Sequence, residues 1–252
     1  MKILITGSEG FIGKSLVEYL SPMHEIIGVD RLSGKEAVEL SEKSLRHVDI
    51  VIHLAAQTSV WNEDDKQIVE DNIVAFKCIF DLCRKLNKKL IWASSSCAVN
   101  ITSLYGLTKH FCEEYHKLNN YGNCVCLRFH NVYGKNARKD TLLGKCFNNN
   151  IVYLYNNGKN RRHFTYIEDV CKCIERSFDM PAGIYNVYNE EENTTEEFVN
   201  EVKKYKNIEV VYLPEKREKD KEHQKVETDV QNLLKTPTKI GMGIENIMKI
   251  KN

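Results

Sequence analysis

A serine, a tyrosine and a lysine near the middle of the chain have the types and the spacing of a proton-transfer set. Tyr105 and Lys109 are four residues apart, so on a helix their side chains would share one face. An ammonium beside a phenol favours the phenolate and lowers the pKa of the tyrosine toward working pH. Ser96 offers a hydroxyl that could share the proton. Tyrosine and lysine also occur at this spacing as an ordinary surface pair, so the surrounding sequence must distinguish a catalytic set from a surface pair.

Those surroundings are elements of a parallel sheet. The serines Ser94, Ser95 and Ser96 follow an apolar run at 90–93 that reads as a strand, and residues 105–118 have helical spacing. Ligands of open parallel sheets bind beyond the carboxyl ends of the strands. This placement favours a catalytic set over a surface pair.

The N-terminal segment predicts a dinucleotide site. An apolar strand runs into Gly7, Gly10 and Gly13, a helix follows at 14–20, and a second strand at 25–29 ends at Asp30. Gly7 permits the tight turn, Gly10 lets the backbone approach a pyrophosphate, and Gly13 allows close packing of the helix on the strand. The helix N-terminus then offers N–H groups and a positive dipole end to the phosphates.

Asp30 favours NAD over NADP. A carboxylate at the tip of the second strand can accept hydrogen bonds from the adenosine ribose and would repel a 2′-phosphate. The neighbouring Arg31 leaves NADP open, because a guanidinium at this point could pair with that phosphate.

Strands and helices alternate along the rest of the first half, with strands expected at 48–54, 90–93 and 124–129 and helices at 64–86 and 105–118. The alternation predicts an α/β fold with a Rossmann-like, doubly wound parallel sheet. Past residue 134 the pattern breaks into short apolar pieces, and a helix at 167–178 could return to the sheet. We expect an NAD-binding domain at 1–133 and 164–184, interleaved with a small substrate-binding lobe at 134–163 and 185–252.

Composition excludes several classes of protein. Lys and Arg total 36 against 35 acidic residues, so no net charge attracts nucleic acid or a membrane surface. No apolar run reaches the ~18 residues of a spanning helix, and the N-terminus lacks the layout of a signal peptide. The nine cysteines lack a C-x-x-C pair and lie mostly in apolar patterns, which indicates buried reduced thiols and no metal site. These features predict a soluble cytoplasmic protein.

The ordered motifs resemble the extended short-chain dehydrogenases/reductases, specifically the NAD-dependent nucleotide-sugar epimerase/dehydratase family, of the UDP-glucose 4-epimerase type but shortened. Beyond the glycine turn, the segments 51–57, 127–134, 161–170, 183–188 and 226–230 follow family patterns. The resemblance implies that Ser96, Tyr105 and Lys109 are catalytic. It implies that NAD is bound by Gly7, Gly10, Phe11, Ile12, Gly13, Asp30, Arg31, Leu54, Ala55, Ala56, Asn72, Ser94, Tyr105, Lys109 and Phe129.

On the substrate side the resemblance implies a nucleotide-diphosphate sugar bound by Ser96, Asn131, Arg162 and Arg217. Guanidinium groups grip phosphate oxygens bidentately, which suits both arginines to a diphosphate. Arg217 lies in a charged run that could equally be a solvated loop. We interpret His130 and His163 as packed or hydrogen-bonded side chains rather than bases.

The chain also departs from the family. The space between Asp30 and Asp49 is too short for a strand with two crossovers, so we expect one edge strand of the sheet to be missing. The stretch at 97–104 is abbreviated, which would remove a loop that normally covers the site.

The resemblance implies that Tyr105, as phenolate, removes a proton from a sugar hydroxyl while a hydride passes to the nicotinamide, giving a keto-sugar. A 4,6-dehydratase would carry Asp-Glu after the catalytic hydroxyl, but Cys97 and Ala98 occupy those positions. The absence of this Asp-Glu pair favours an epimerase, which is an isomerase, over a dehydratase. Dehydratase, reductase or decarboxylase activity stays open, as do an NADP-dependent reductase and a non-catalytic dinucleotide sensor.

The helices expected at 64–86 and 105–118 resemble the pair that forms a dimer contact in relatives. Phe76, Phe80, Phe111 and Tyr115 could supply its apolar seam, although core packing explains them as readily. We expect a homodimer.

Overall fold

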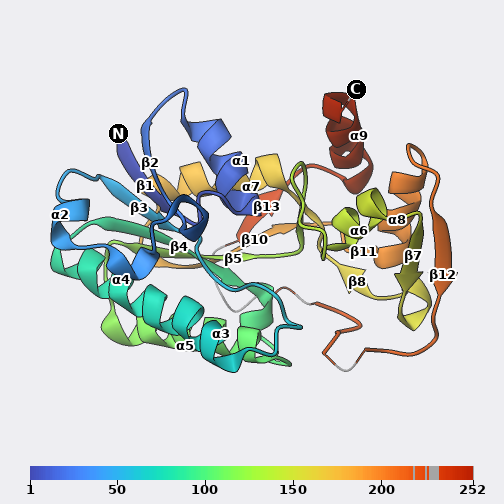
Figure 1. The fold of residues 1–252 in the computed structure, drawn as a ribbon, viewed down its shortest axis with the longest axis horizontal. Coiled ribbons are helices and arrows are strands. Elements are labelled where there is room, and N and C mark those ends of the chain that lie inside the picture. Colours follow the sequence, from blue (N-terminus) through green and yellow to red (C-terminus); the bar gives the residue numbers. More distant parts are fainter. Residues whose placement is uncertain (218, 225, 227–232, 252) are drawn as a thin grey trace.

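Seven parallel strands form the main sheet (Figure 1). The computed structural model describes residues 1–217, 219–224, 226 and 233–251. The strand order is β13-β10-β5-β4-β3-β1-β2, and each neighbouring pair is parallel. The strands are β1 (Lys2–Thr6), β2 (Glu25–Val29), β3 (Ile50–His53), β4 (Lys89–Ser95), β5 (Cys124–Phe129), β10 (Gly183–Asn189) and β13 (Leu233–Thr236). The predicted Rossmann-like fold is confirmed.

Helices cover both faces of this sheet (Figure 1). One face carries α1 and α7, and the other carries α4 and α5. The α-helices are α1 (Phe11–Leu20), α2 (Glu42–Leu45), α3 (Asp65–Val69), α4 (Ala75–Lys85), α5 (Leu104–Asn119), α6 (Leu142–Asn148), α7 (Ile167–Arg176), α8 (Thr195–Lys203) and α9 (Ile240–Lys251). The single helix expected at 64–86 is divided by a π-helical turn at Glu70–Val74.

The sequence periodicity explains why the sheet is buried on both faces. In α4, Phe76, Ile79, Phe80 and Cys83 recur at helical spacing and are all buried. They pack against Trp92 of β4, with the ring centroids of Phe76 and Trp92 4.5 Å apart. The two central strands β4 and β5 are nearly continuous apolar runs, as parallel strands covered on both faces must be.

The expected missing edge strand is confirmed. Between β2 and β3 the chain forms two short 3₁₀ turns, Arg31–Ser33 and Ala37–Glu39, and the single helical turn α2. No residue of the described segment 31–47 is in a strand, and β2 is the edge of the sheet.

A smaller lobe lies beside the carboxyl ends of the strands (Figure 1). It contains α6, α8 and two parallel pairs and one antiparallel pair of short strands. These pairs are β6 (Val132–Tyr133) with β9 (Thr165–Tyr166), β7 (Ile151–Leu154) with β12 (Glu209–Tyr212), and β8 (Arg161–Arg162) with β11 (Asn193–Thr194).

The expected boundary between 184 and 185 falls inside β10, because hydrogen bonding continues that strand to Asn189. In addition, β13 belongs to the main sheet although it lies within the expected lobe segment 185–252. Of the motif expected at 226–230, residues 227–230 lie outside the described residues. None of the helices in the described parts of the chain combines the length and the apolar character needed to span a bilayer.

Candidate functional site

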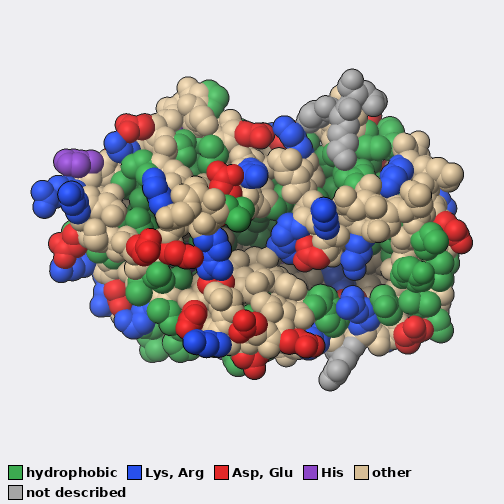
Figure 2. All heavy atoms as spheres, in the orientation of Figure 1, with side chains coloured by type: hydrophobic (Ala, Val, Ile, Leu, Met, Phe, Trp, Pro, Cys, Tyr) green, Lys and Arg blue, Asp and Glu red, His purple; other side chains and the backbone are tan. Residues whose placement is uncertain are grey.

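A cleft of about 1110 Å³ opens at the carboxyl ends of β1, β3, β4 and β5. Figure 2 shows the surface hollowed near the middle of this face, with Lys and Arg side chains around the hollow. The glycine turn, Asp30 and the serine-tyrosine-lysine set all line this one cleft. Ligands bind at this edge of open α/β sheets, where the strand order reverses between β1 and β3.

The glycine turn forms a cradle that only glycine fits. Gly7 has a φ of +72°, and its N–H donates to the carbonyl oxygen of Val29 over 2.8 Å. A Cβ at Gly13 would stand 2.0 Å from the carbonyl oxygen of Gly7. Gly10 caps α1 without a side chain, so the N-terminus of that helix faces the cleft with its backbone bare. This geometry fits a pyrophosphate.

The second strand ends as a ribose site requires. The carboxylate of Asp30 lines the cleft and accepts hydrogen bonds from the backbone N–H groups of Glu9 and Leu32, each over 3.0 Å. Arg31 is engaged elsewhere, because its guanidinium pairs with Asp71, with an N–O distance of 2.6 Å. With Arg31 neutralised by a carboxylate, the rim does not favour a 2′-phosphate, and the residues present fit NAD.

Ser96, Tyr105 and Lys109 are buried and line the same cleft. Ser103 caps α5 by accepting from the N–H of Gly106, which starts the helix one residue before Tyr105. The Lys109 ammonium donates to the carbonyl oxygen of Ala93 over 2.9 Å. Helix α5 therefore turns both side chains toward the end of β4.

The expected lowering of the Tyr105 pKa is not found. Burial raises the pKa of Tyr105, while a hydrogen bond to Ser95 and the charge of Arg138 act in the opposite direction. Burial likewise lowers the pKa of Lys109. Burial is the largest cause of both shifts and decides their direction.

The three consecutive serines have separate partners. Ser94 donates to the buried carboxylate of Glu113, which also holds the guanidinium of Arg128. Ser95 accepts from the N–H of Cys97 over 3.1 Å, and its side chain acts against the rise in the pKa of Tyr105. Ser96 accepts from the amide of Gln224. Sequence reasoning therefore missed Ser95, the serine that acts on the pKa of Tyr105.

Asn72 does not line the cleft, although it was expected at the cofactor. Its side chain donates to the carbonyl oxygen of Gln57 and to the hydroxyl of Thr108, each over 3.0 Å, and accepts from the N–H of Gln57 over 2.7 Å. Through these hydrogen bonds Asn72 connects the loop after β3 with α5. Leu54, Ala55 and Ala56 of that loop do line the cleft, as expected.

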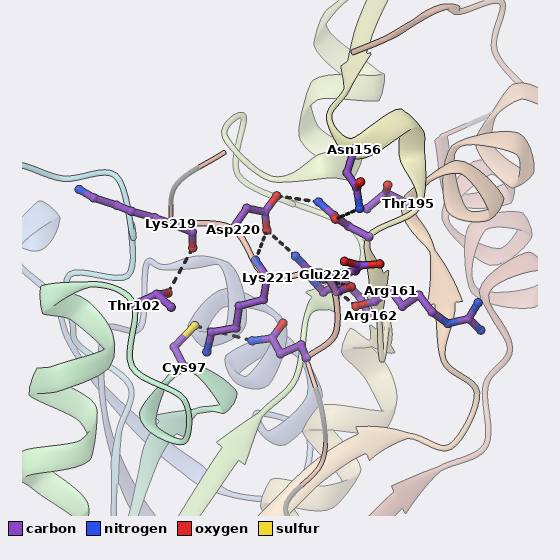
Figure 3. Close-up of polar contacts among 12 residues, drawn as sticks. Cys97, Thr102, Asn156, Arg161, Arg162, Thr195, Lys219, Asp220, Lys221 and Glu222 are labelled. Carbon is purple, nitrogen blue, oxygen red and sulfur yellow. Dashed lines mark hydrogen bonds and ion pairs between the residues drawn. The ribbon is translucent and has the colours of Figure 1, made fainter. Parts of the chain in front are cut away.

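The residues expected to bind the substrate also fall into two groups, those that line the cleft and those that do not. Asn131 lines the cleft at a φ of +22°, a left-handed conformation that asparagine tolerates. Arg162 and Arg217 are not among the cleft-lining residues of the described chain. Arg162 is buried and pairs with Asp220 (Figure 3), and the Arg217 guanidinium lies 3.5 Å from the ring centroid of Trp61.

These contacts account for the absence of Arg162 and Arg217 from the cleft lining of the described chain. The Arg217 side chain is half-buried, with the ring of Tyr155 also 5.1 Å from its guanidinium, although residues 214–216 before it are exposed. His130 and His163 are packed as expected, with ring centroids 5.8 Å apart. His163 hydrogen-bonds the carbonyl oxygen of Asn189 over 2.8 Å.

Sequence reasoning also missed further residues that line the cleft. Arg138 lines the cleft, donates to Thr58 and forms an ion pair over 3.0 Å with Asp140, which also lines the cleft. Gln57, Trp61 and Gln224 line it as well. Arg138 follows the 127–134 motif closely, so the sequence could have identified it as a residue of the site. No sequence pattern pointed to Gln224.

Comparison with known proteins identifies the family. Residues 3–189 match the model of the "NAD dependent epimerase/dehydratase family". Protein CapI of Staphylococcus aureus is 31% identical over 237 residues, covering 73% of this chain and 71% of CapI.

Solved structures share the fold. The UDP-glucuronic acid 4-epimerase of Bacillus cereus, solved with UDP-glucuronic acid and NAD, has a TM-score of 0.84 at 21% identity, covering 99% of this chain and 98% of that one. TunA, described as an NAD-dependent NDP-hexosamine 5,6-dehydratase involved in tunicamycin biosynthesis, has a TM-score of 0.85 at 22% identity, covering 98% and 96%. With its sequence match over most of the chain, this protein belongs to the NAD-dependent epimerase/dehydratase family.

Proposed function

We propose that this protein is a nucleotide-sugar epimerase that uses NAD and acts through a transient keto-sugar. One observation carries the proposal: Ser96, Tyr105 and Lys109 line the same buried cleft as the glycine cradle and Asp30. A protein that only senses a dinucleotide has no need of a proton-transfer set at the far end of the cofactor cleft. Family membership and the NAD-dependence of the family support the same reading.

Each group of residues has a role that follows from its place in the cleft. The glycine cradle would hold the pyrophosphate and Asp30 the ribose. Bound NAD supplies a hydride acceptor that can return the hydride to the opposite face of the sugar. Tyr105 takes the proton of the sugar hydroxyl, and Lys109 holds positive charge beneath the site. Ser96 donates a hydrogen bond to the sugar oxygen as charge develops there.

Burial sets a condition on this chemistry. Burial raises the pKa of Tyr105, which disfavours the phenolate that takes up the sugar proton. Positive charge near the phenol opposes this effect. Arg138, whose charge already opposes the rise in the pKa, lines the cleft with Tyr105.

Epimerisation is favoured over dehydration by the residue after Ser96. Cys97 lines the cleft at that position, and Ala98 is buried behind it, so this stretch supplies no carboxylic acid for eliminating water. The shared fold does not separate the two reactions, because the B. cereus epimerase and the TunA dehydratase both have it.

We further propose that the substrate is a nucleoside-diphosphate sugar with an anionic group near Arg138. Arg138 lines the cleft between the loop after β3 and the smaller lobe, where an anionic group of the sugar would compete with Asp140 for its guanidinium. The B. cereus relative was solved with a sugar nucleotide whose sugar is an acid, UDP-glucuronic acid, which fits a cation at this place.

The test is an incubation of purified protein and NAD with UDP-, GDP- and dTDP-sugars, including uronic acids, with the products resolved by chromatography and mass spectrometry. An epimerase gives a product of unchanged mass and no net NADH. A product lighter by one water supports a dehydratase, and net NADH or a preference for NADPH supports an oxidoreductase. Bound NAD without turnover of any sugar contradicts the proposal and favours a sensor.

We also propose a homodimer, on a narrower basis than the sequence suggested. Phe76 and Phe80 are buried in the core beneath α4 and cannot form an intersubunit seam. Phe111 and Leu107 on α5 are 44% and 49% exposed and remain available for one. Light scattering that shows only monomer would remove this proposal.

A further inference from the structure

Gln224 lies outside the residues 3–189 that match the family model, yet its side chain reaches the catalytic serine. It is 8% exposed and lines the cleft. Its amide nitrogen donates to the hydroxyl oxygen of Ser96 and lies 3.7 Å from the sulfur of Cys97.

Gln224 ends a segment, residues 219–224, that we call the strap. The strap is fixed at several points (Figure 3): the Asp220 carboxylate pairs with Arg162 and accepts from the side chain of Asn160 over 3.0 Å. Its backbone is also held, since the carbonyl oxygen of Glu222 accepts from the N–H of Arg161 over 2.7 Å.

The other side of the strap contacts the sheet domain. The hydroxyl of Thr102 donates to the carbonyl oxygen of Lys219 over 3.2 Å, and Lys221 lies beside Cys97 in Figure 3. The position of the Gln224 amide is therefore determined by contacts to both the smaller lobe and the loop after Ser96.

The hydrogen bond from Gln224 restricts what the Ser96 hydroxyl can do. A serine hydroxyl has one hydrogen to donate and two lone pairs that accept. The Gln224 amide fills one lone pair, so the Ser96 hydrogen cannot point at that nitrogen. No acceptor for this hydrogen is found among residues 1–217, 219–224, 226 and 233–251, and Ser96 lines the cleft. The hydrogen is thus left for a ligand.

We propose that Gln224 is a positioning residue that holds Ser96 as a hydrogen-bond donor toward the reacting oxygen of the sugar. The inference rests on the proposed function, because only a sugar whose hydroxyl is oxidised builds up charge on that oxygen. A donor fixed beforehand stabilises the charge without having to reorient during the reaction. The strap, which the family model does not cover, would thereby complete the active site of this chain.

The experiment compares Gln224→Glu and Gln224→Met with the wild-type protein on the sugar nucleotide that the panel identifies. The carboxylate of Gln224→Glu has the shape of the amide but accepts the Ser96 hydrogen, which turns the donor away from the sugar. We expect kcat to fall about 10–100-fold near neutral pH, with KM changed less than about threefold. The ratio of variant to wild-type kcat, measured at the same pH, should recover as the pH is lowered and the new carboxyl is protonated, whereas the ratio for Gln224→Met should stay low at every pH.

Two controls separate positioning from mere docking of the strap. Lys216→Gln removes an exposed ion pair to Glu222 and should leave kcat unchanged. The alkylation rate of Cys97, mapped by peptide mass spectrometry, reports whether the strap still covers that thiol. It should not rise above the wild-type rate in Gln224→Glu, because a carboxylate 3.7 Å from the thiol can only slow alkylation unless the strap undocks.

Wild-type kcat and pH profile in Gln224→Glu would overturn the inference. So would faster Cys97 alkylation and a raised KM in both variants without recovery at low pH, because that result is an undocked strap. Failure of the proposed function is seen separately and earlier, as a wild-type protein that binds NAD but converts none of the sugars, and it would remove the inference as well.

Discussion

The α-carbon of Gly13 packs so tightly on the carbonyl oxygen of Gly7 that a Cβ there would stand 2.0 Å away. We therefore predict that Gly13→Ala forces the turn apart and weakens NAD binding. Overpacking of about 1–3 kcal/mol corresponds to roughly a fivefold to 150-fold rise in the Kd for NAD. Isothermal titration calorimetry measures it.

Gly122→Ala is the matched control, because nothing lies within 4 Å of a Cβ at that position. It should leave the Kd unchanged. Equal Kd values for Gly13→Ala and the wild type would show that the cradle does not hold the cofactor.

Asp30 should set both the affinity for NAD and the choice against NADP. Its carboxylate stands at the rim of the cleft, and removing a charged hydrogen-bond acceptor costs about 1.5–3 kcal/mol. We expect Asp30→Ala to raise the Kd for NAD about 10–100-fold and to narrow the preference over NADP. Glu42→Gln, in an exposed ion pair, is the control. An unchanged preference would contradict the ribose role.

The ion pair between Glu113 and Arg128 should be a strong stability determinant. Both side chains are nearly fully buried, and the closest N–O distance is 2.6 Å. Glu113→Gln removes the buried carboxylate charge that pairs with the Arg128 guanidinium and accepts from Ser94, so we predict a loss of about 3–5 kcal/mol in the free energy of unfolding. Chemical denaturation measures this loss. Glu114→Gln, one residue along α5 and exposed, should cost far less.

Acidification should destabilise the fold through three buried histidines. Burial lowers the pKa of His53 to about 3 and the pKa values of His116 and His130 to about 4, from an ordinary 6.5. The unfolded chain therefore binds more protons between pH 6.5 and 4, so the free energy of unfolding falls as the pH drops through that window.

Each histidine contributes a slope of up to about 1.4 kcal/mol per pH unit in that window. Urea unfolding at successive pH values measures the slope. His130→Gln should flatten it, whereas His47→Gln, at an exposed site, should not. A stability that is independent of pH between 4 and 6.5 would contradict the burial argument.

Sequence reasoning predicted what depends on local pattern. The glycine turn, Asp30 and the strands follow from periodicity and turn chemistry, and a strand such as 124–129 was placed at its observed bounds. The absent edge strand followed from the length of one segment, because residues 31–47 are too few for a strand with two crossovers.

What could not be predicted depends on contacts distant along the chain. The pairing of Arg162 with Asp220 and the stacking of Arg217 on Trp61 join segments far apart in sequence, and they take both arginines from the cleft lining. The pKa of Tyr105 likewise depends on its burial, which no spacing reveals. Gln224 reaches Ser96 across 128 positions of sequence.

The most direct test of the account is turnover by Tyr105→Phe, measured beside the wild type with NAD and the converted sugar nucleotide. Tyr105 is buried at the cleft, so losing its hydroxyl removes the proton acceptor with little change in shape. We predict a loss of about 10²–10⁴-fold in kcat, with the Kd for NAD within about twofold of wild type. A variant that turns over the sugar as fast as the wild type would contradict the account.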